Sequence, residues 1–422
     1  MPLDQQKALL FGSAAAVRLL LFTAFPSLPN RLAGRVEVST PVTSFKRLQE
    51  GLFLYTHNVS PYDGGVYHQA PLLLPLFSLL PNPSYYPFAT SVLFTMVDLL
   101  SALALAQIAE SGQSVVTRLF KSSRKDLRWS SVAIAAGFLF NPFTVATCIA
   151  RSTSALTNLF ILTAMAKASQ GASFTFVLAL SFASYLAMHP LLLFPPLLVL
   201  LYDARASKTK SAPSPFLFSV VHTLGLAAAV CALLFVSALL TGSWDFLAAT
   251  YGVRLLLPDL TPNVGLWWYF FTEMFDSFRE FFLGVFWLHV ASYMPGLTIR
   301  LRKQPLFVAT TLTGIFAIFT PYPSIADATL YLSLVPLFRH LFPLMRYTFL
   351  ASASILYASF LGPAFYHLWI YAGSGNANFF YAITLVWSLG LSIIVGDSLY
   401  AALRDELDVE RPELRGEEVK RI

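Results

Sequence analysis

Two asparagines and two aromatic residues stand close together in a glycine-rich turn near the C-terminus. Asn376 and Asn378 are two residues apart, and Phe379 and Tyr381 follow at once. Each amide offers two hydrogen-bond donors and an acceptor, which suits sugar hydroxyls or a phosphate, and aromatic rings can cover a sugar face or an acyl chain. Capping of the next helix, expected to begin near residue 378, explains one asparagine but not both. The pattern therefore favours contact between this turn and a ligand.

A second unusual segment, residues 258–282, places charges within an apolar stretch. Glu273, Asp276, Arg279 and Glu280 would each cost about 2.5–3.5 kcal/mol in a lipid-facing helix, so they cannot all face lipid. A pair between Asp276 and Arg279 at helical spacing would offset part of this cost. Two interpretations stay open: an amphipathic helix on the membrane surface, or a polar pocket for a headgroup in which Glu273 and Asp276 take part.

Acid–base chemistry would use carboxylates at close spacing, and the chain offers few. Glu37 stands in the segment 35–41 without a second carboxylate two residues away, while Glu50 and Asp63 are isolated. A carboxylate can act as a base, but holding a metal takes several ligands. The histidines follow no metal-ligand spacing, and the G-x-S-x-G, H-E-x-x-H and phosphate-loop motifs do not occur. We therefore expect no metal and no cofactor.

The elements that must position these residues follow from composition. The chain has 422 residues, of which 56% are hydrophobic and only 12% are charged, and its mean hydropathy is +0.64. Soluble domains have about 25% charged residues, so the composition excludes a soluble enzyme or a disordered chain and indicates an integral membrane protein. The net charge of +6 comes from basic residues in short gaps between apolar runs, which argues against nucleic-acid binding.

The apolar runs are continuous and about as long as membrane-spanning helices, which predicts an all-α polytopic protein rather than a strand barrel. We expect about twelve transmembrane helices in a single domain, residues 1–403, followed by a charged cytosolic tail, residues 404–422. Pro190 is expected to break or kink the chain between two of the weakest runs. The expected spans are 7–25, 86–110, 129–147, 152–168, 172–188, 191–202, 216–240, 276–298, 305–320, 324–343, 346–371 and 377–403.

Positive charge predicts the orientation of these helices. Lys and Arg concentrate in the gaps 111–128, 203–215 and 299–304, which we place in the cytosol together with both termini. The opposite, luminal face then receives the loops 26–85, 241–275 and 372–378.

The first luminal loop carries features of its own. Residues 44–55 alternate apolar and charged positions at helical spacing, which predicts an amphipathic helix at the membrane surface. Asn58 begins the sequon Asn58-Val59-Ser60 and is a candidate for N-glycosylation on the luminal side. The loop is interpreted either as a lid packed on the bundle or as the wall of a cavity for a lipid-linked substrate.

The order of these features resembles the C-type glycosyltransferase architecture, found in polytopic enzymes that use dolichol-phosphate sugars. Those enzymes carry an acidic pair at the start of the first luminal loop, where this chain has only Glu37. A more specific resemblance is to the PIG-U family of glycosylphosphatidylinositol (GPI) transamidase subunits, and it extends from the first span to about residue 404. It is carried by PDLTPN at 258–263 with WYFFTEMF at 268–275, by HLWIYAGSGNANFFYA at 367–382 and by SPYDGGVYHQAP at 60–71.

This resemblance implies a non-catalytic, multi-pass subunit in the endoplasmic reticulum membrane, which helps to bind the GPI lipid or to recognise the attachment signal. The catalytic residues would lie on a cysteine-protease-like subunit, PIG-K, and the other partners would be PIG-S, PIG-T and a GAA-type subunit. Carried over by motif, the candidates for GPI contact are, in order, Asn376, Asn378, Phe379, Tyr381, Glu273 and Asp276.

Two other functions are weighed against this one. A GPI mannosyltransferase that uses dolichol-phosphate mannose, with Glu37 or Asp63 as the base, is supported by architecture alone. A lipid transporter ranks last, because the sequence shows no inverted repeat and no matched pair of broken helices.

Overall fold

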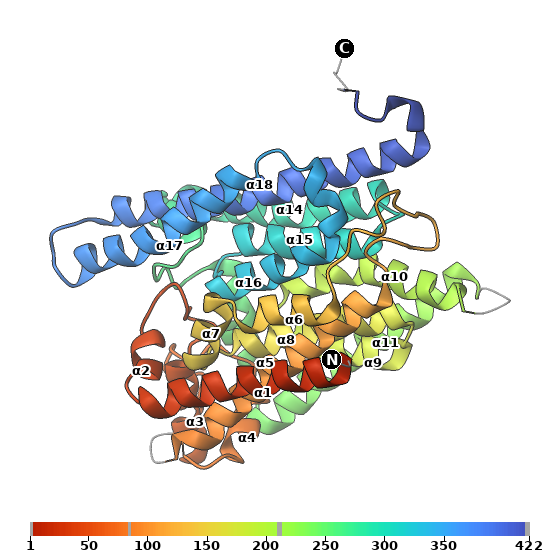
Figure 1. Ribbon diagram of the computed structural model, residues 1–422. Coiled ribbons are helices and arrows are strands. Elements are labelled where there is room, and N and C mark those ends of the chain that lie inside the picture. Colours follow the sequence, from red (N-terminus) through yellow and green to blue (C-terminus); the bar gives the residue numbers. More distant parts are fainter. Residues whose placement is uncertain (1–2, 83–85, 209–212, 418–422) are drawn as a thin grey trace.

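The computed structural model describes residues 3–82, 86–208 and 213–417, which fold into helices joined by turns and loops (Figure 1). The first half forms α1 (Leu3–Ala24), α2 (Leu28–Leu32), α3 (Phe45–Thr56), α4 (Leu73–Ser78), α5 (Pro87–Ser111), α6 (Ser131–Leu139), α7 (Pro142–Ile149), α8 (Ser154–Gln170), α9 (Ser173–Leu186), η1 (His189–Leu193) and α10 (Phe194–Ala206). The second half forms α11 (Pro215–Thr241), η2 (Ala248–Gly252), α12 (Val253–Leu256), α13 (Trp267–Thr272), α14 (Asp276–Arg300), α15 (Pro305–Phe319), α16 (Ile325–Leu334), η3 (Val335–Leu344), α17 (Thr348–Ile370), α18 (Ala377–Glu410) and η4 (Pro412–Leu414). Over these ranges no strand forms, and the predicted all-helical class is confirmed.

Fewer helices than expected are long enough to cross a membrane alone. Within the described residues, six helices pass by length and apolar composition, namely α1, α5, α11, α14, α17 and α18. The pair α6–α7, bent by 54°, adds a seventh if it is one span. The prediction of about twelve spans is therefore not confirmed. Prolines account for part of the difference: Pro190 and Pro336 lie in 3-10 turns, where α9 and α16 end after 14 and 10 residues.

The helix α15 lies at the centre of the bundle. Every residue from Pro305 to Ile318 is buried, and the helix packs against α10, α14, α16 and α18. The antiparallel hairpin of α17 and α18 lies along one edge, and α1 with α5 and α6 lies along the opposite edge (Figure 1). A short apolar helix can therefore be buried among other helices without spanning the bilayer itself.

The loops gather at two opposite ends of the bundle. Figure 1 shows α2, α3 and the turn between α17 and α18 at one end, and the start of α1, the end of α18 and the loop between α5 and α6 toward the other. The basic loop between α5 and α6 and the end of α18 therefore lie at the same end of the bundle.

The sequence predicts a charged cytosolic tail that begins at residue 404. In the structure, the first residues of this tail are largely buried rather than exposed to solvent. The helix α18 continues to Glu410, and its residues Asp405 and Asp408 are buried. Arg124, from the loop between α5 and α6, donates to Asp405 at 2.7 Å and to Asp408 at 2.6 Å. These charge-assisted hydrogen bonds fasten the start of the tail to the bundle.

The helix predicted at residues 44–55 is α3, and it packs against neighbouring helices on one side. Its ring Phe45 packs edge-on against Phe77 of α4 and Phe94 of α5, with centroids 6.0 and 5.9 Å apart. On its other side, Arg47 donates to Asp259 at 2.9 Å. Burial alone would raise the pKa of Asp259, but hydrogen bonds from Thr261 and the charge of Arg47 hold it below its usual value.

A second contact of the first loop, made by His68, is sensitive to pH. Nδ1 of His68 donates to the carbonyl of Ala249 at 2.9 Å, and burial lowers the pKa of His68 although this hydrogen bond opposes the shift. His68 therefore binds a proton more readily in the unfolded chain than in the folded chain. The contribution of neutral His68 to the stability of the folded state is complete above about pH 6.5 and is lost as the pH falls below that value.

We expect the melting temperature of the purified chain in detergent to fall between pH 7.5 and 5.5, and His68→Gln to reduce this pH dependence. His57→Gln is the matched control, since His57 is exposed at the end of α3. An equal pH dependence in the wild-type chain and the His68→Gln variant would contradict the assignment.

Candidate functional site

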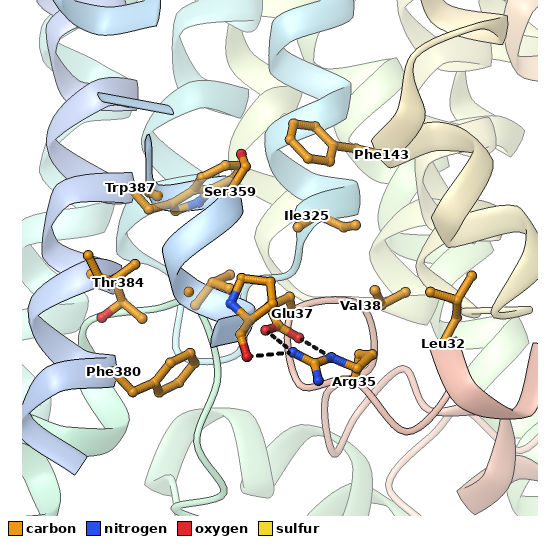
Figure 2. Close-up of a pocket in the computed structure, with 15 residues that line it drawn as sticks. Leu32, Arg35, Glu37, Val38, Phe143, Ile325, Ser359, Phe380, Thr384 and Trp387 are labelled. Carbon is orange, nitrogen blue, oxygen red and sulfur yellow. Dashed lines mark hydrogen bonds and ion pairs between the residues drawn. The ribbon is translucent and has the colours of Figure 1, made fainter. Parts of the chain in front are cut away.

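An apolar cavity of about 310 Å³ lies between the first loop and the hairpin of α17 and α18 (Figure 2). Two small residues of α17, Ala358 and Gly362, line it, so larger side chains there would fill the space. The rest of the wall comes from residues 32–38, α7, Val264, the start of α16, α17 and α18. A concave, mostly hydrocarbon wall with a few placed polar groups is typical of ligand sites.

One ion pair interrupts the apolar wall. Arg35 donates through Nε and Nη2 to the carboxylate of Glu37 at 3.2 and 2.9 Å, and Nη2 also lies 3.4 Å from the carbonyl oxygen of Pro363 (Figure 2). The backbone N–H of Ile325 donates to the carbonyl of Glu37 at 2.9 Å. Both carboxylate oxygens of Glu37 therefore accept hydrogen bonds from the guanidinium of Arg35.

The indole of Trp387 supplies an unpaired donor on the same wall. Its side chain is only 5% exposed, yet its Nε1–H has no hydrogen-bond partner among the described residues. An unpaired buried donor costs about 1–3 kcal/mol, and a buried tryptophan N–H usually finds a partner. A ligand oxygen in the cavity would provide that partner.

The two asparagines of the turn have different roles in the structure. Asn376 caps α18, because its side-chain oxygen accepts from the backbone N–H of Phe379 at 3.3 Å. Asn378 accepts a hydrogen bond from the hydroxyl of Tyr269. Both side chains are exposed, and within the described ranges no hydrogen bond involves their amide N–H groups. Capping thus explains Asn376, and the amide donors of both remain available to a ligand.

An aromatic cluster joins the two segments that the sequence singled out. Tyr269 stacks on Tyr381 with centroids 4.5 Å apart, and Trp268 stacks on Trp369 at 6.2 Å. Phe380, which is fully buried and lines the cavity, packs in the same cluster. The asparagine turn therefore lies one helical turn from the cavity, on the same helix.

The remaining candidates lie away from the cavity wall. Phe379 is 54% exposed and stacks on Phe365 at 5.8 Å, while Glu273 and Asp276 are exposed at the turn from α13 to α14. Arg279 donates to the carbonyl of Leu257 rather than to Asp276, so the expected pair between Asp276 and Arg279 does not form.

Two residues of the first loop are also exposed. Asn58 lies in the turn after α3, with a positive φ of 57°, and Asp63 lies in the turn that follows. Neither residue lines the cavity.

A second apolar cavity, of about 400 Å³, lies on the other side of α18. Phe380 and Thr384 face the first cavity, whereas Tyr381 and Leu385 face the second. The hydroxyl of Tyr381 donates to the carbonyl of Leu266 at 3.1 Å. This hydrogen bond helps to hold α18 in place as the wall between the two cavities.

Sequence reasoning missed three residues of this site. Arg35 stands two positions before Glu37, so its pairing was visible as a local signal. Tyr269 was visible only within the motif WYFFTEMF at 268–275, and Trp387 lies in an ordinary apolar run. For Trp387 the sequence carries no signal, because an unpaired donor is a tertiary property.

The fold and the site define a multi-pass helical membrane protein with an apolar cavity beside an exposed polar turn, and the described residues contain no cluster of ligands for a metal ion. The family model described as GPI transamidase subunit PIG-U matches residues 12–387. The chain belongs to this family.

Relatives from animals and fungi cover nearly the whole chain. The human GPI-anchor transamidase component PIGU is 36% identical over 410 residues, which is 93% of this chain and 92% of the human protein. The GPI transamidase component GAB1 of Saccharomyces cerevisiae is 36% identical over 394 residues, 93% of each chain. The GAB1 homologue of Schizosaccharomyces pombe is 36% identical over 392 residues, 92% of this chain and 91% of the yeast protein.

Proposed function

We propose that this protein is a non-catalytic subunit of the GPI transamidase in the endoplasmic reticulum membrane, and that it binds the GPI lipid at the cavity and the adjoining asparagine turn. The observation that carries the proposal is the apolar cavity with an unpaired indole donor, one helical turn from exposed amides. The names of the relatives support the assembly.

The chemistry of a glycolipid fits this arrangement in two parts. Its hydrocarbon gains about 0.8 kcal/mol for each CH₂ group buried in an apolar cavity, and an ester or ether oxygen can accept from Trp387. Its glycan and phosphate can accept from the amides of Asn376 and Asn378. Phe379 and Tyr381 lie beside them, while Glu273 and Asp276 form part of the nearby surface.

The catalytic residues belong, in this proposal, to the cysteine-protease-like subunit PIG-K, with PIG-S, PIG-T and a GAA-type subunit as further partners. Affinity isolation from native membranes in mild detergent, followed by mass spectrometry of proteins and lipids, tests the assembly and the ligand together. We expect a cysteine-protease-like subunit and GPI. Recovery of the chain alone with dolichol-linked mannose would instead support a mannosyltransferase, and Glu37→Gln would then be the decisive variant.

The role of Asn378 can be separated from its structural hydrogen bond. We expect Asn378→Ala to lower GPI retention about fivefold, the effect of losing one hydrogen bond of about 1 kcal/mol. Tyr269→Phe removes the same internal hydrogen bond but leaves the amide, so it is expected to retain GPI normally. An equal loss in both variants, measured by lipid mass spectrometry, would indicate a structural role only.

A further inference from the structure

A basic cleft of about 430 Å³ lies at the other end of the bundle, away from the proposed GPI site. It is formed by the connection from η3 to α17, the end of α18, the loop between α5 and α6 and the C-terminal segment. Four arginines line it (Arg124, Arg346, Arg404 and Arg415) against two carboxylates (Asp408 and Glu417).

Two of these arginines are already neutralised, because Arg124 pairs with Asp405 and Asp408, and Arg404 pairs with Asp408. Asp408 accepts from Nη2 of Arg124 at 2.6 Å and from Nε of Arg404 at 2.9 Å, so both of its oxygens are used. The remaining nitrogens of Arg404 donate to the carbonyls of Leu414 and Glu417, each at 2.7 Å. These contacts shape the cleft but leave little charge for a ligand.

The other two arginines have no carboxylate partner among the described residues. Arg346 donates to the hydroxyl of Tyr400 at 2.5 Å and lies over its ring, 4.4 Å from the centroid. Arg415 is exposed. Asp397, the nearby acid, accepts from the backbone N–H groups of Arg346 and Tyr347 instead. Glu417 also lines the cleft and carries one negative charge against the two positive charges of these arginines.

Exposed apolar side chains follow Arg346 directly in the chain. Tyr347 and Phe349, at the start of α17, are 56% and 86% exposed, and α17 is one of the helices long enough to cross the membrane. We infer that the cleft binds the phosphate-bearing headgroup of an anionic phospholipid, whose acyl chains run along the start of α17. The positive charge of this end places the site in the cytosolic leaflet, where anionic lipids are concentrated.

Binding of dioctanoyl phosphatidylserine to the purified full-length chain in neutral detergent tests this inference, with dioctanoyl phosphatidylcholine as the neutral probe. Since each arginine near a charged headgroup contributes about fivefold, we expect Arg346→Gln with Arg415→Gln to weaken phosphatidylserine binding about 30-fold. Glu417→Gln should strengthen it about fivefold, a gain that a merely structural role would not produce. Arg411→Gln is the matched control, because Arg411 is exposed but does not line the cleft.

Equal affinity for both lipids, or an unchanged affinity in the double variant, would overturn the inference. So would an equal loss in the Arg411→Gln control, which would indicate unspecific attraction by net charge. Glycerophosphoserine distinguishes the source of the phosphate: if it binds as tightly as the lipid, the ligand is a soluble phosphate ester and the lipid assignment fails.

Discussion

Replacing Ala358 by phenylalanine is expected to lower the GPI content of the purified complex about 60-fold. Ala358 lies on α17 with only 4% of its surface exposed and lines the apolar cavity. A phenyl ring there would occupy space that hydrocarbon of the lipid would fill. Displacing three CH₂ groups at about 0.8 kcal/mol each costs about 2.4 kcal/mol, which is about 60-fold in affinity. Mass spectrometry of lipids, normalised to protein, measures the result.

The same substitution should leave the chain folded, because the ring enters existing space rather than overpacking the core. Ala364→Phe is the matched control: Ala364 lies on the same helix but is exposed, so its GPI content should stay normal. If the Ala358→Phe complex retains GPI at the wild-type level with an unchanged melting temperature, the cavity is not where the lipid binds.

The class of fold is predictable from this sequence, whereas the number of spans is not. Hydropathy measures how apolar a run is, but crossing a bilayer also needs an unbroken helix of about 20 residues. The run at 324–343 contains Pro336 and divides into α16 and η3. The run at 305–320 is apolar because α15 is buried in protein on all sides, not because it faces lipid along its length.

The candidate site is predictable only in part, and the reason is tertiary contact. The sequence identified the turn with Asn376 and Asn378, and the structure places it beside the segment 258–282 through the stacking of Tyr269 on Tyr381. Nothing in the sequence indicates that Arg35 pairs across the cavity wall with Pro363, or that the indole of Trp387 lacks a partner. Such properties depend on residues more than 300 positions apart, so local patterns do not contain them.

The largest effect on stability is expected from Asp98→Ala. Arg18 is fully buried in α1, and its Nε donates to Asp98 of α5 at 2.8 Å while Nη2 donates to the carbonyl of Leu139 at 2.9 Å. Removing the carboxylate leaves a buried guanidinium without a counter-charge, which costs about 3–5 kcal/mol. Reversible unfolding of the purified chain in mixed detergent measures this loss, and Ser101→Ala, one turn along α5, is the control.

The double variant Arg18→Met with Asp98→Leu separates charge from packing. Because apolar residues of similar volume can replace a buried ion pair at little cost, its loss should be only about 1 kcal/mol, from the unpaired carbonyl of Leu139. A double variant as unstable as Asp98→Ala would mean that the hydrogen-bonded shape of this junction, rather than its charge balance, holds α1, α5 and α6 together. Near-recovery of stability would instead show that the cost of Asp98→Ala comes from the unpaired charge of Arg18. The ion pair would then serve to fix the position of α1 against α5, because any arrangement that separates the two charges is destabilised.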